Sequence, residues 1–522
     1  MGASSGGIAR AATLVGVVTA GSMVLGLVRD TVVAAVFGAG AELDAFLVAQ
    51  GLMNLVLGLL AGAVAKSAVP VLARDAATGE TGRAGRTVSV ALSVTVVALG
   101  LASVVMWLAA DAVVTVLAPG FAGAQQTLAV DLTRVVLVAT VLVAGTNLLA
   151  AAAQAHHRFF WAAFQGVPFN LVMIAAAAVW GPRYGVVALA WGFVLGSAAR
   201  LVCQLVPLRE IGLRLRPSLA LDDAGAREIA VLVPPLLLAS AVTNVNTLVD
   251  RAVGSGQGEG VITALSYGWR VVGLFETLLV ASLVTALYPA MGAAAGEGVD
   301  RLRDLVRRSL AAVLVVLVPV TAVLLVAAAP LVALLFGRGD FDPAAVDLTA
   351  TAVVWYAPAG LALAWREVVV RASYAAGDTR GPLWAAIVAM VVNVVGDLTL
   401  GRIYGVAGLA VSTTLSLVVA AGLATRLLRR RHAGVAVRGM VPVLLRTGVA
   451  GAVATAAGWG VVVAVSAQLG PGAAQRSGPA ALVLVGAAGA VAVAAFVGVL
   501  AGLRAPELWE GRRVLRRVLR RR

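Results

Sequence analysis

Cysteine and histidine are scarce in this chain of 522 residues, which has one cysteine, Cys203, and three histidines. One cysteine cannot form an intrachain disulfide, and no thiol pair or zinc ligand set is present in the sequence. We therefore expect no metal site and no cofactor. Phosphate-cradling Gly-x-x-x-x-Gly-Lys sequences, dinucleotide fingerprints and nucleophile, base and acid sets are also missing, so the sequence does not predict an enzyme.

Charged residues are scarce as well. They make up 12% of the chain, whereas an ordinary soluble domain has about a quarter. Hydrophobic residues reach 61% and the mean hydropathy is +0.98, which excludes a water-soluble fold of the usual kind. The net charge of +15 comes from arginines in short clusters between apolar runs. This placement is typical of membrane topology, and we expect no nucleic-acid partner.

Long apolar segments predict an all-α integral membrane protein with fourteen transmembrane helices. The segments lie at about 9–37, 42–73, 85–109, 126–155, 159–181, 184–208, 229–252, 260–292, 302–336, 344–375, 381–401, 405–428, 441–467 and 479–503. Arginines gather in alternate connections, for example Arg209, Arg214 and Arg216 after the sixth segment. Cytoplasmic connections hold the excess of basic residues, so both termini are expected in the cytoplasm.

A repeat at an offset of about 220 residues indicates an internal duplication. The segment Tyr184 to Ala190 (YGVVALA) recurs as Tyr404 to Ala410 (YGVAGLA), with a chance match of Gly-rich sequence as the alternative. Units with an even number of spans enter the membrane in the same orientation, so we expect two parallel six-helix lobes around a central cavity. The expected parts are an N-lobe at 1–217, a C-lobe at 218–432, two C-terminal helices at 433–503 and a basic cytoplasmic tail at 504–522 that binds anionic lipid.

Ionisable residues inside the predicted spans point to function, because a charge inside the bilayer costs several kcal/mol unless it faces a cavity or a partner. Such residues are Arg29, Asp30, Asp44, Lys66, Arg134, Arg270, Glu276, Arg366, Glu367 and Arg371. Arg270 has no opposite charge three or four positions away. A guanidinium group suits phosphate oxygens, so Arg29 and Arg270 are candidate anion ligands. The alternative is pairing between helices, for example of Arg29 with Asp44.

The other polar residues in the spans have more than one interpretation. Glu367 and Arg371 are four positions apart and are expected to pair along one helix face. Asp30 and Asp44 either hold the arginines in place or bind a coupling cation. Lys66 is expected to extend to the membrane interface. Asparagines in the spans bind helices together or contact substrate: Asn54, Asn170, Asn244, Asn246 and Asn393.

Several segments resemble one known family. The run from Ser22 to Asp30 (SMVLGLVRD), then Phe37 to Gly40 (FGAG), Asp44 to Phe46 and Asn54, resembles the opening of the MurJ/MviN family of lipid II flippases, within the multidrug/oligosaccharidyl-lipid/polysaccharide exporter superfamily. Further similar segments are Val69-Pro70, Asn246 to Arg251, Tyr267 with Arg270, Leu287 to Pro289, Gly339 to Phe341 and Arg371 to Arg380.

The resemblance implies a transporter of the bacterial cytoplasmic membrane. Members of this family move lipid II, the undecaprenyl-diphosphate-linked peptidoglycan precursor, from the inner to the outer leaflet by alternating access. Carried over by motif, Arg29 and Arg270 bind the diphosphate, while Asp30, Asp44 and Asn54 organise the cavity. The implied partners are lipid II, membrane lipids and cell-wall synthesis enzymes.

The chain also departs from the family pattern at positions that usually carry charge. These positions appear here as Met23, Gly51, Leu57, Gly58, Gly62, Trp269 and Gly273. Loss of cavity charge favours a different cargo, either another polyprenyl-linked saccharide or an amphipathic drug exported by cation exchange. A third hypothesis is a transport-inactive scaffold that recruits cell-wall enzymes.

Overall fold

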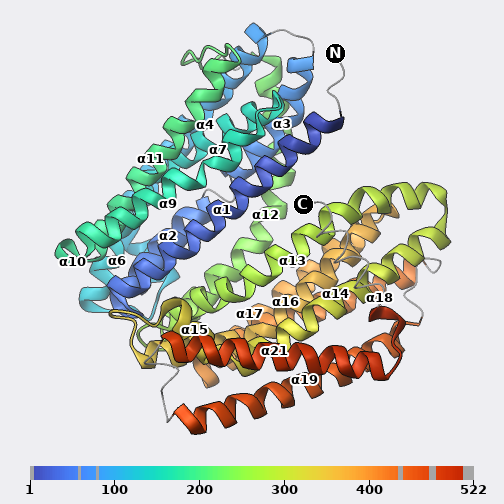
Figure 1. Cartoon of the computed structure of the whole chain (residues 1–522). Helices are drawn as coiled ribbons and strands as arrows, with labels where there is room; N and C mark the ends of the chain where they lie inside the picture. The colour runs from blue at the N-terminus through green and yellow to red at the C-terminus, as the bar shows by residue number, and fades with distance from the viewer. Residues whose placement is uncertain are drawn as a thin grey trace. The chain divides into compact units, whose positions relative to one another are not determined.

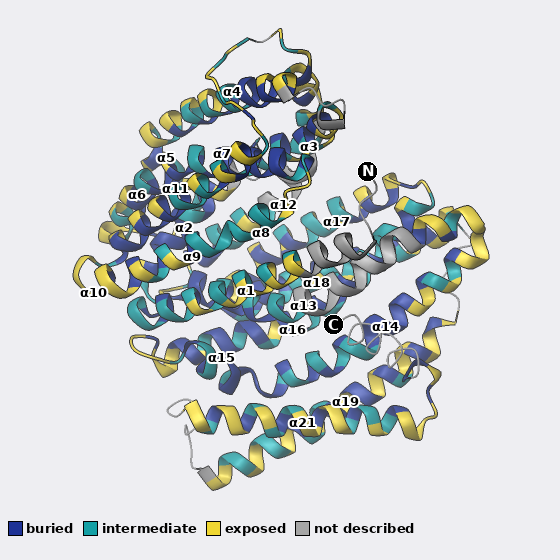
Figure 2. Ribbon diagram, turned by 45° about the horizontal axis from the view of Figure 1, so that its top comes forward, coloured by how far each residue is buried: buried dark blue, intermediate teal, exposed yellow. Residues whose placement is uncertain are grey.

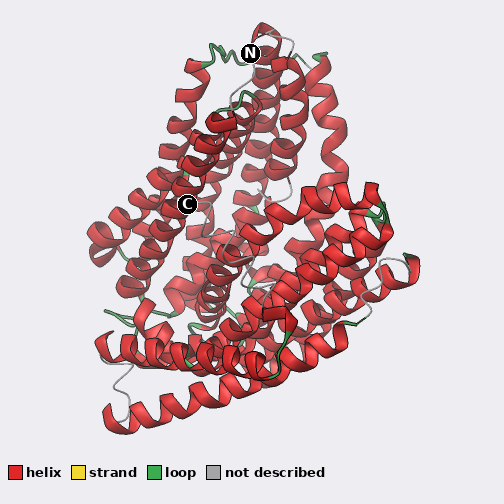
Figure 3. Cartoon of the chain, turned by 45° about the vertical axis from the view of Figure 1, so that its right-hand side comes forward, coloured by secondary structure: helices red, strands yellow, loops and turns green. Residues whose placement is uncertain are grey.

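A computed structural model describes residues 5–56, 60–77, 81–220, 222–432, 439–469 and 478–508 (Figure 1). Across these residues the chain forms helices joined by loops and turns, and no strand occurs among them (Figure 3). The prediction of an all-α membrane protein is thus confirmed. The side chains of Asn244 and Glu276 lie outside the described residues, as does the tail from residue 509 onward.

The helices group into two compact units. Unit 1 comprises Met1–Glu259 with Arg338–Phe341, and unit 2 comprises Gly260–Gly337 with Asp342–Arg522.

Unit 1 contains α1 (Ser5–Phe37), α2 (Ala41–Val56), α3 (Gly62–Ala77), α4 (Thr81–Leu108), α5 (Ala110–Leu117), α6 (Gly123–Leu137), α7 (Ala139–Ala155), α8 (Phe159–Phe164), α9 (Gly166–Ala175), the π-helix η2 (Ala176–Trp180), α10 (Gly181–Tyr184), α11 (Val186–Glu210) and α12 (Ala224–Gly254). Its core includes Leu72, Val88 and Leu149, all buried, where α3, α4 and α7 meet. Because Asp223 accepts a hydrogen bond from the Ala226 N–H at 2.8 Å, it caps the start of α12, which packs against α3.

Unit 2 contains α13 (Val261–Glu297), α14 (Val299–Val326), α15 (Ala328–Phe336), α16 (Pro343–Ala375), α17 (Arg380–Gly396), the π-helix η3 (Asp397–Gly401), α18 (Arg402–Arg431), α19 (Met440–Leu469) and α21 (Gly478–Gly502). Buried Leu310, Val368 and Leu428 belong to its core, between α14, α16 and α18. Helices α19 and α21 pack on each other and on α14 (Figure 1). Both carry exposed residues along much of their length (Figure 2), and since these residues are largely apolar, the surface suits contact with lipid.

The described residues bear on the number of membrane crossings only through helix length and composition. Ten helical segments are long and apolar enough to cross a membrane by length and composition among the described residues, so the count of fourteen is not confirmed. One of the ten, Arg380–Arg431, has 52 residues. A straight helix of that length measures about 78 Å, far more than a hydrocarbon core of about 30 Å. Gly405, with φ 59° and ψ −132°, breaks it.

The repeated sequence occupies the same local structure in each unit. Gly185 and Gly405 both have φ 59°, and each follows a π-helix by a few residues. Both glycines end one helix and begin the next, so that α9 and η2 pack against α11 in unit 1, and α17 and η3 pack against α18 in unit 2. Only glycine readily adopts this region of φ and ψ, which explains why it stands at both positions of the repeat.

Each of these helix pairs, α9 and η2 with α11 and α17 and η3 with α18, is a helical hairpin. The two hairpins share one close helix contact, at positions that differ by the same offset of 220 residues. In unit 1 a Cβ at Gly192 would overlap the Cβ of Ala176, and in unit 2 a Cβ at Gly396 would overlap the Oγ of Ser412. Gly192 corresponds to Ser412, and Ala176 corresponds to Gly396. The residue without a side chain is therefore on opposite helices of the hairpin in the two units.

Candidate functional site

Arg29 lies within α1 and contacts a carboxylate on its own helix. Its Nη2 and Nε atoms donate to Asp30 Oδ1 at 2.8 and 3.0 Å, and its Nη1 donates to Asn170 Oδ1 at 3.1 Å. The carboxylate that Arg29 contacts is thus Asp30 rather than Asp44. About 20% of the Arg29 side chain is exposed, which leaves part of the guanidinium open to a ligand.

Close packing of α1 against α9 positions this arginine. Gly166 of α9 faces Ser22 of α1, and a Cβ at Gly166 would overlap the Ser22 Oγ. The Asn170 Nδ2 donates to the Ser22 carbonyl at 3.2 Å, so this asparagine binds two helices together as well as contacting Arg29. The run from Ser22 to Asp30 is thereby held at both ends.

A second arginine, Arg200 on α11, lies in the same part of unit 1. The Cζ atoms of Arg200 and Arg29 are 5.0 and 5.8 Å from the centre of the Phe169 ring. A cation this close to an aromatic face is attracted to it. Arg200 forms no ion pair with a carboxylate in the described part of the chain, and its buried Nε has no hydrogen-bond partner there. Arg200 was not among the predicted site residues, although it is a charged residue inside the predicted span 184–208.

A third arginine, Arg251 at the end of α12, occupies the space beside Gly51 of α2. A Cβ at position 51 would overlap the Nη1 of Arg251 and lie 2.9 Å from its Nη2. Gly51 is one of the positions where the resembling family usually has charge. The Arg251 guanidinium, which extends from α12, therefore occupies the space that a side chain at position 51 of α2 would fill. Sequence comparison of α2 alone does not reveal this contact.

Asp44 and Asn54 lie near opposite ends of α2. Asp44 is 1% exposed and sits in the first turn, where the positive end of the helix dipole stabilises a carboxylate. Asn54 is exposed near the other end of the helix. Within the span predicted at 42–73, the described residues form α2 and α3.

Two segments of the family resemblance meet at the end of α1. The Asp340 N–H donates to the Ala35 carbonyl at 2.9 Å. Gly38 has φ +61° and Gly339 has φ +60°, and a Cβ on either would run into the backbone of the other segment. Gly38 of FGAG and Gly339 of GDF are therefore required by one close contact between two backbones.

Arg270 lies in unit 2, nine residues after the first residue of α13. Its Cζ is 5.4 Å from the centre of the buried Tyr267 ring, which stacks on Phe336 at 4.8 Å. Gly268 packs directly against Ala352 of α16. The Tyr-Gly-Trp segment thus fixes α13 against α15 and α16 and leaves Arg270 half-buried.

Most other charged residues of the spans have structural partners. Glu367 and Arg371 form the expected pair, at 3.7 Å. Arg134 pairs with Asp131 at 3.5 Å and lies over the Trp107 ring. Lys66 is exposed, in agreement with extension to the interface.

Asp378 lies in the turn between α16 and α17, outside the spans. Burial by itself raises the pKa of this carboxyl, but the Gly381 N–H at 2.9 Å, the Arg431 guanidinium at 3.0 Å and the Arg380 N–H at 3.0 Å outweigh burial and lower the pKa below its usual value. Asp378 therefore joins the start of α17 to the end of α18 in its charged form.

Among the described residues, no group of three or more histidine, cysteine, aspartate or glutamate residues is placed to hold a metal ion. Half-buried arginines inside apolar helical bundles, each held by aromatic rings or amides, are typical of polytopic membrane transporters. The fold and the arrangement of charge define this class of protein.

Comparisons with known proteins identify the family. The sequence model of lipid II flippase MurJ matches residues 33–476. A probable lipid II flippase MurJ of Vibrio cholerae is 30% identical over 469 residues, covering 87% of this chain and 88% of that protein. The lipid II flippase MurJ of Burkholderia cenocepacia is 29% identical over 403 residues, covering 75% and 78%. The chain belongs to the lipid II flippase MurJ family.

Solved structures agree on the fold. A lipid II flippase MurJ in an inward closed conformation superposes with a TM-score of 0.77 at 17% identity, covering 94% of this chain and 98% of that chain. An inward-facing multidrug resistance transporter of the MATE family and the MOP superfamily gives a TM-score of 0.68 at 17% identity, covering 79% and 95%.

Proposed function

We propose that this chain carries lipid II from the inner to the outer leaflet of the bacterial cytoplasmic membrane by alternating access. The supporting observation is membership of the MurJ family together with half-buried arginines in apolar spans. Each proposed diphosphate ligand lies well inside its helix. Arg29 is about 12 Å from the end of α1, and Arg270 is about 14 Å from the start of α13. Both depths are close to half of a hydrocarbon core of about 30 Å.

The roles of the individual residues follow from their surroundings. Asp30 and Asn170 hold the Arg29 guanidinium in a fixed orientation, which reduces the entropy lost when a phosphate binds. Asp44 and Asn54 are proposed to organise the cavity from the two ends of α2. Arg200, over the Phe169 ring, and Arg251, beside Gly51, add positive charge in unit 1. This charge supports an anionic cargo, although Gly51 and Gly273 are uncharged at positions where the family usually has charge.

Replacement of Arg270 tests the proposal in cells that depend on this chain. We expect Arg270→Ala to lower exposure of lipid II on the outer leaflet by about tenfold or more, because losing hydrogen bonds to a charged group costs about 1.5–3 kcal/mol. Arg402→Ala, an exposed arginine elsewhere in unit 2, is the matched control. Unchanged lipid II exposure in Arg270→Ala cells would remove Arg270 from substrate binding.

The alternatives predict different results in the same cells. Accumulation of another polyprenyl-linked saccharide on depletion would indicate a different cargo. Normal growth after combined loss of Arg29, Arg270 and Asp44 would indicate a scaffold that recruits cell-wall enzymes. The lobes at 1–217 and 218–432, the helices at 433–503, the tail at 504–522 and the cytoplasmic termini stay predictions.

A further inference from the structure

Unit 2 contains a long apolar pocket between α14, α16, α18 and α19. Its volume is about 820 Å³, within the range of ligand sites in proteins. Most of the wall is aliphatic: Leu314, Pro358, Leu361, Ala362, Val418, Ala421 and Leu444. Val418 and Leu444 are 48% and 43% exposed, so the apolar wall opens onto the surface of the unit. An apolar opening of this kind on a membrane protein suits entry of a lipid chain.

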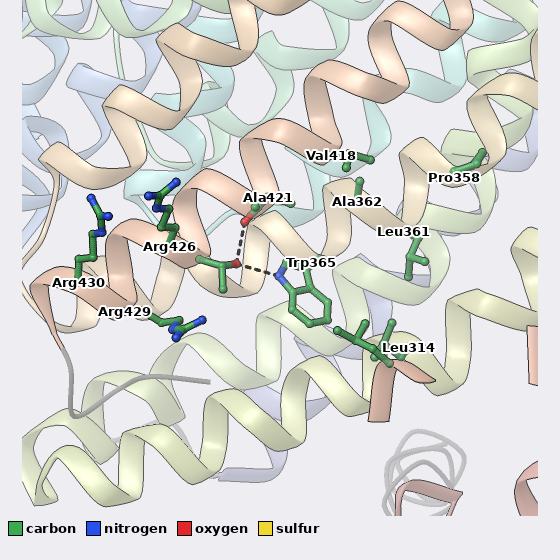
Figure 4. A pocket seen from close by; sticks show the side chains of 13 residues that line it. Leu314, Pro358, Leu361, Ala362, Trp365, Val418, Ala421, Arg426, Arg429 and Arg430 are labelled. Atoms are coloured by element: carbon green, nitrogen blue, oxygen red, sulfur yellow. Dashed lines mark hydrogen bonds between the residues drawn. The ribbon is translucent and has the colours of Figure 1, made fainter. Parts of the chain in front are cut away.

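Three arginines lie at one end of the pocket. Arg426, Arg429 and Arg430 stand on the last turns of α18, spaced so that they face the same side of the helix. Figure 4 shows them at the opposite end from Pro358 and Val418. All three are exposed, and none forms an ion pair with a carboxylate in the described part of the chain. Their neighbour Arg431 differs, because it pairs with Asp378. The pocket therefore ends in three positive charges available to an anion.

A tryptophan marks the boundary between the two parts. The Trp365 Nε1 donates to Thr425 Oγ1 at 3.0 Å, and Thr425 in turn donates to the Ala421 carbonyl at 2.7 Å (Figure 4). The indole is thus fixed with its polar edge near the arginines and its ring beside the aliphatic wall. Tryptophan prefers this position at the boundary between headgroups and hydrocarbon.

The length of the pocket matches the acyl chain of a lipid in one leaflet. From Val418 to Arg430 the pocket follows α18 for about 18 Å. One leaflet contributes about half of a hydrocarbon core of about 30 Å, so an acyl chain of one leaflet fits beside α18 with its headgroup at the arginines. The charge pattern predicts this end of α18 on the cytoplasmic side, where the leaflet is rich in anionic lipid.

We propose that this pocket binds an anionic phospholipid of the inner leaflet, with its phosphate at Arg426, Arg429 and Arg430 and an acyl chain along Val418 and Leu444. The occupant is a bilayer phospholipid such as phosphatidylglycerol and is distinct from the transported cargo. The inference does not depend on the transport of lipid II.

Quenching of Trp365 fluorescence tests the proposal. The full chain is reconstituted into two kinds of phosphatidylcholine vesicle. One contains phosphatidylglycerol brominated on its acyl chains, and the other contains the same mole fraction of phosphatidylcholine brominated in the same way. A parallel Trp365→Phe protein separates the signal of Trp365 from that of the nine other tryptophans, ten in all. We expect stronger quenching of Trp365 by brominated phosphatidylglycerol. The preference should fall by about fivefold for each arginine replaced by glutamine, the effect of about 1 kcal/mol per basic residue.

Matched variants separate binding from general charge. Arg209→Gln, Arg214→Gln and Arg216→Gln together remove three exposed arginines from unit 1 and should leave the preference unchanged. Replacing Arg426, Arg429 and Arg430 by lysine keeps the charge and should retain most of the preference. Equal quenching by the two brominated lipids would overturn the proposal. So would displacement of brominated phosphatidylglycerol by an equimolar amount of purified lipid II, which would assign the pocket to the cargo.

Discussion

Replacing Gly51 by alanine is expected to displace the Arg251 guanidinium without unfolding unit 1. The added Cβ would overlap Arg251 Nη1, which is the far end of a long and flexible side chain and moves at little cost. Alanine also favours a helix over glycine by about 0.5–1 kcal/mol. We therefore expect the free energy of unfolding to change by about 1 kcal/mol or less.

Transport should respond more strongly than stability. If the Arg251 guanidinium contributes to binding an anionic headgroup, its displacement costs about 1.5–3 kcal/mol, the range for hydrogen bonds to charged groups. This corresponds to a decrease of about tenfold to a hundredfold in the rate of lipid II transport at low lipid II concentration. The assay is transport of lipid II by the reconstituted protein, with the unfolding temperature measured on the same preparation.

Two further variants make the test specific. Gly51→Ala and Arg251→Ala should not be additive, because both remove the same group from the same place. Gly51→Lys combined with Arg251→Ala returns a cation to that space from α2 and should restore part of the transport. Gly100→Ala is the control, because a Cβ at Gly100 meets nothing within 4 Å. Transport at the wild-type rate by a folded Gly51→Ala protein would refute the reasoning.

Three other predictions concern Arg200, Gly405 and Asp378. Arg200→Met should preserve or raise the unfolding temperature, because a desolvated cation is replaced by an apolar side chain. The same variant should lower lipid II transport, and transport equal to that of wild type would show that Arg200 serves packing alone. Gly405→Ala should destabilise unit 2 by about 1–3 kcal/mol in thermal unfolding, because its φ of 59° and ψ of −132° suit glycine alone, whereas Gly448→Ala should not. The lowered pKa of Asp378 contributes stability above the unfolded pKa of about 3.9 that is lost as the pH falls through the folded pKa. The unfolding temperatures of wild type and Asp378→Asn should therefore converge at low pH, and a constant difference between them would contradict the ion-pair assignment.

Features that depend on local sequence were predictable. The all-helical membrane fold followed from composition and apolar run length, and the pair between Glu367 and Arg371 followed from helix geometry. The repeat led to the two hairpins with their equivalent glycines, Gly185 and Gly405. Composition, helix geometry and a repeated motif can all be read from the sequence without knowing which distant segments are in contact.

Features that depend on distant segments were not predictable from one sequence. Asp30 and Asp44 were both candidates to hold Arg29, but its hydrogen bond to Asn170 of α9 was not predicted. Arg200 and Arg251 gained significance only from what lies beside them, the Phe169 ring and the bare backbone at Gly51. Hydropathy does not report such contacts, because they join residues more than thirty positions apart.

The unequal hairpin contacts limit how far the two hairpins can be exchanged. A graft of α11 in place of α18 would set the equivalent of Gly192 opposite Gly396, leaving a void between two bare backbones. The reverse graft would set the equivalent of Ser412 opposite Ala176, with too many atoms for the space. The glycine of the contact is on the second helix of the hairpin in unit 1 and on the first helix in unit 2. A chimera would therefore contain either the void or the overlap. Because of two small residues, the hairpins of the two units cannot be exchanged without a void or an overlap.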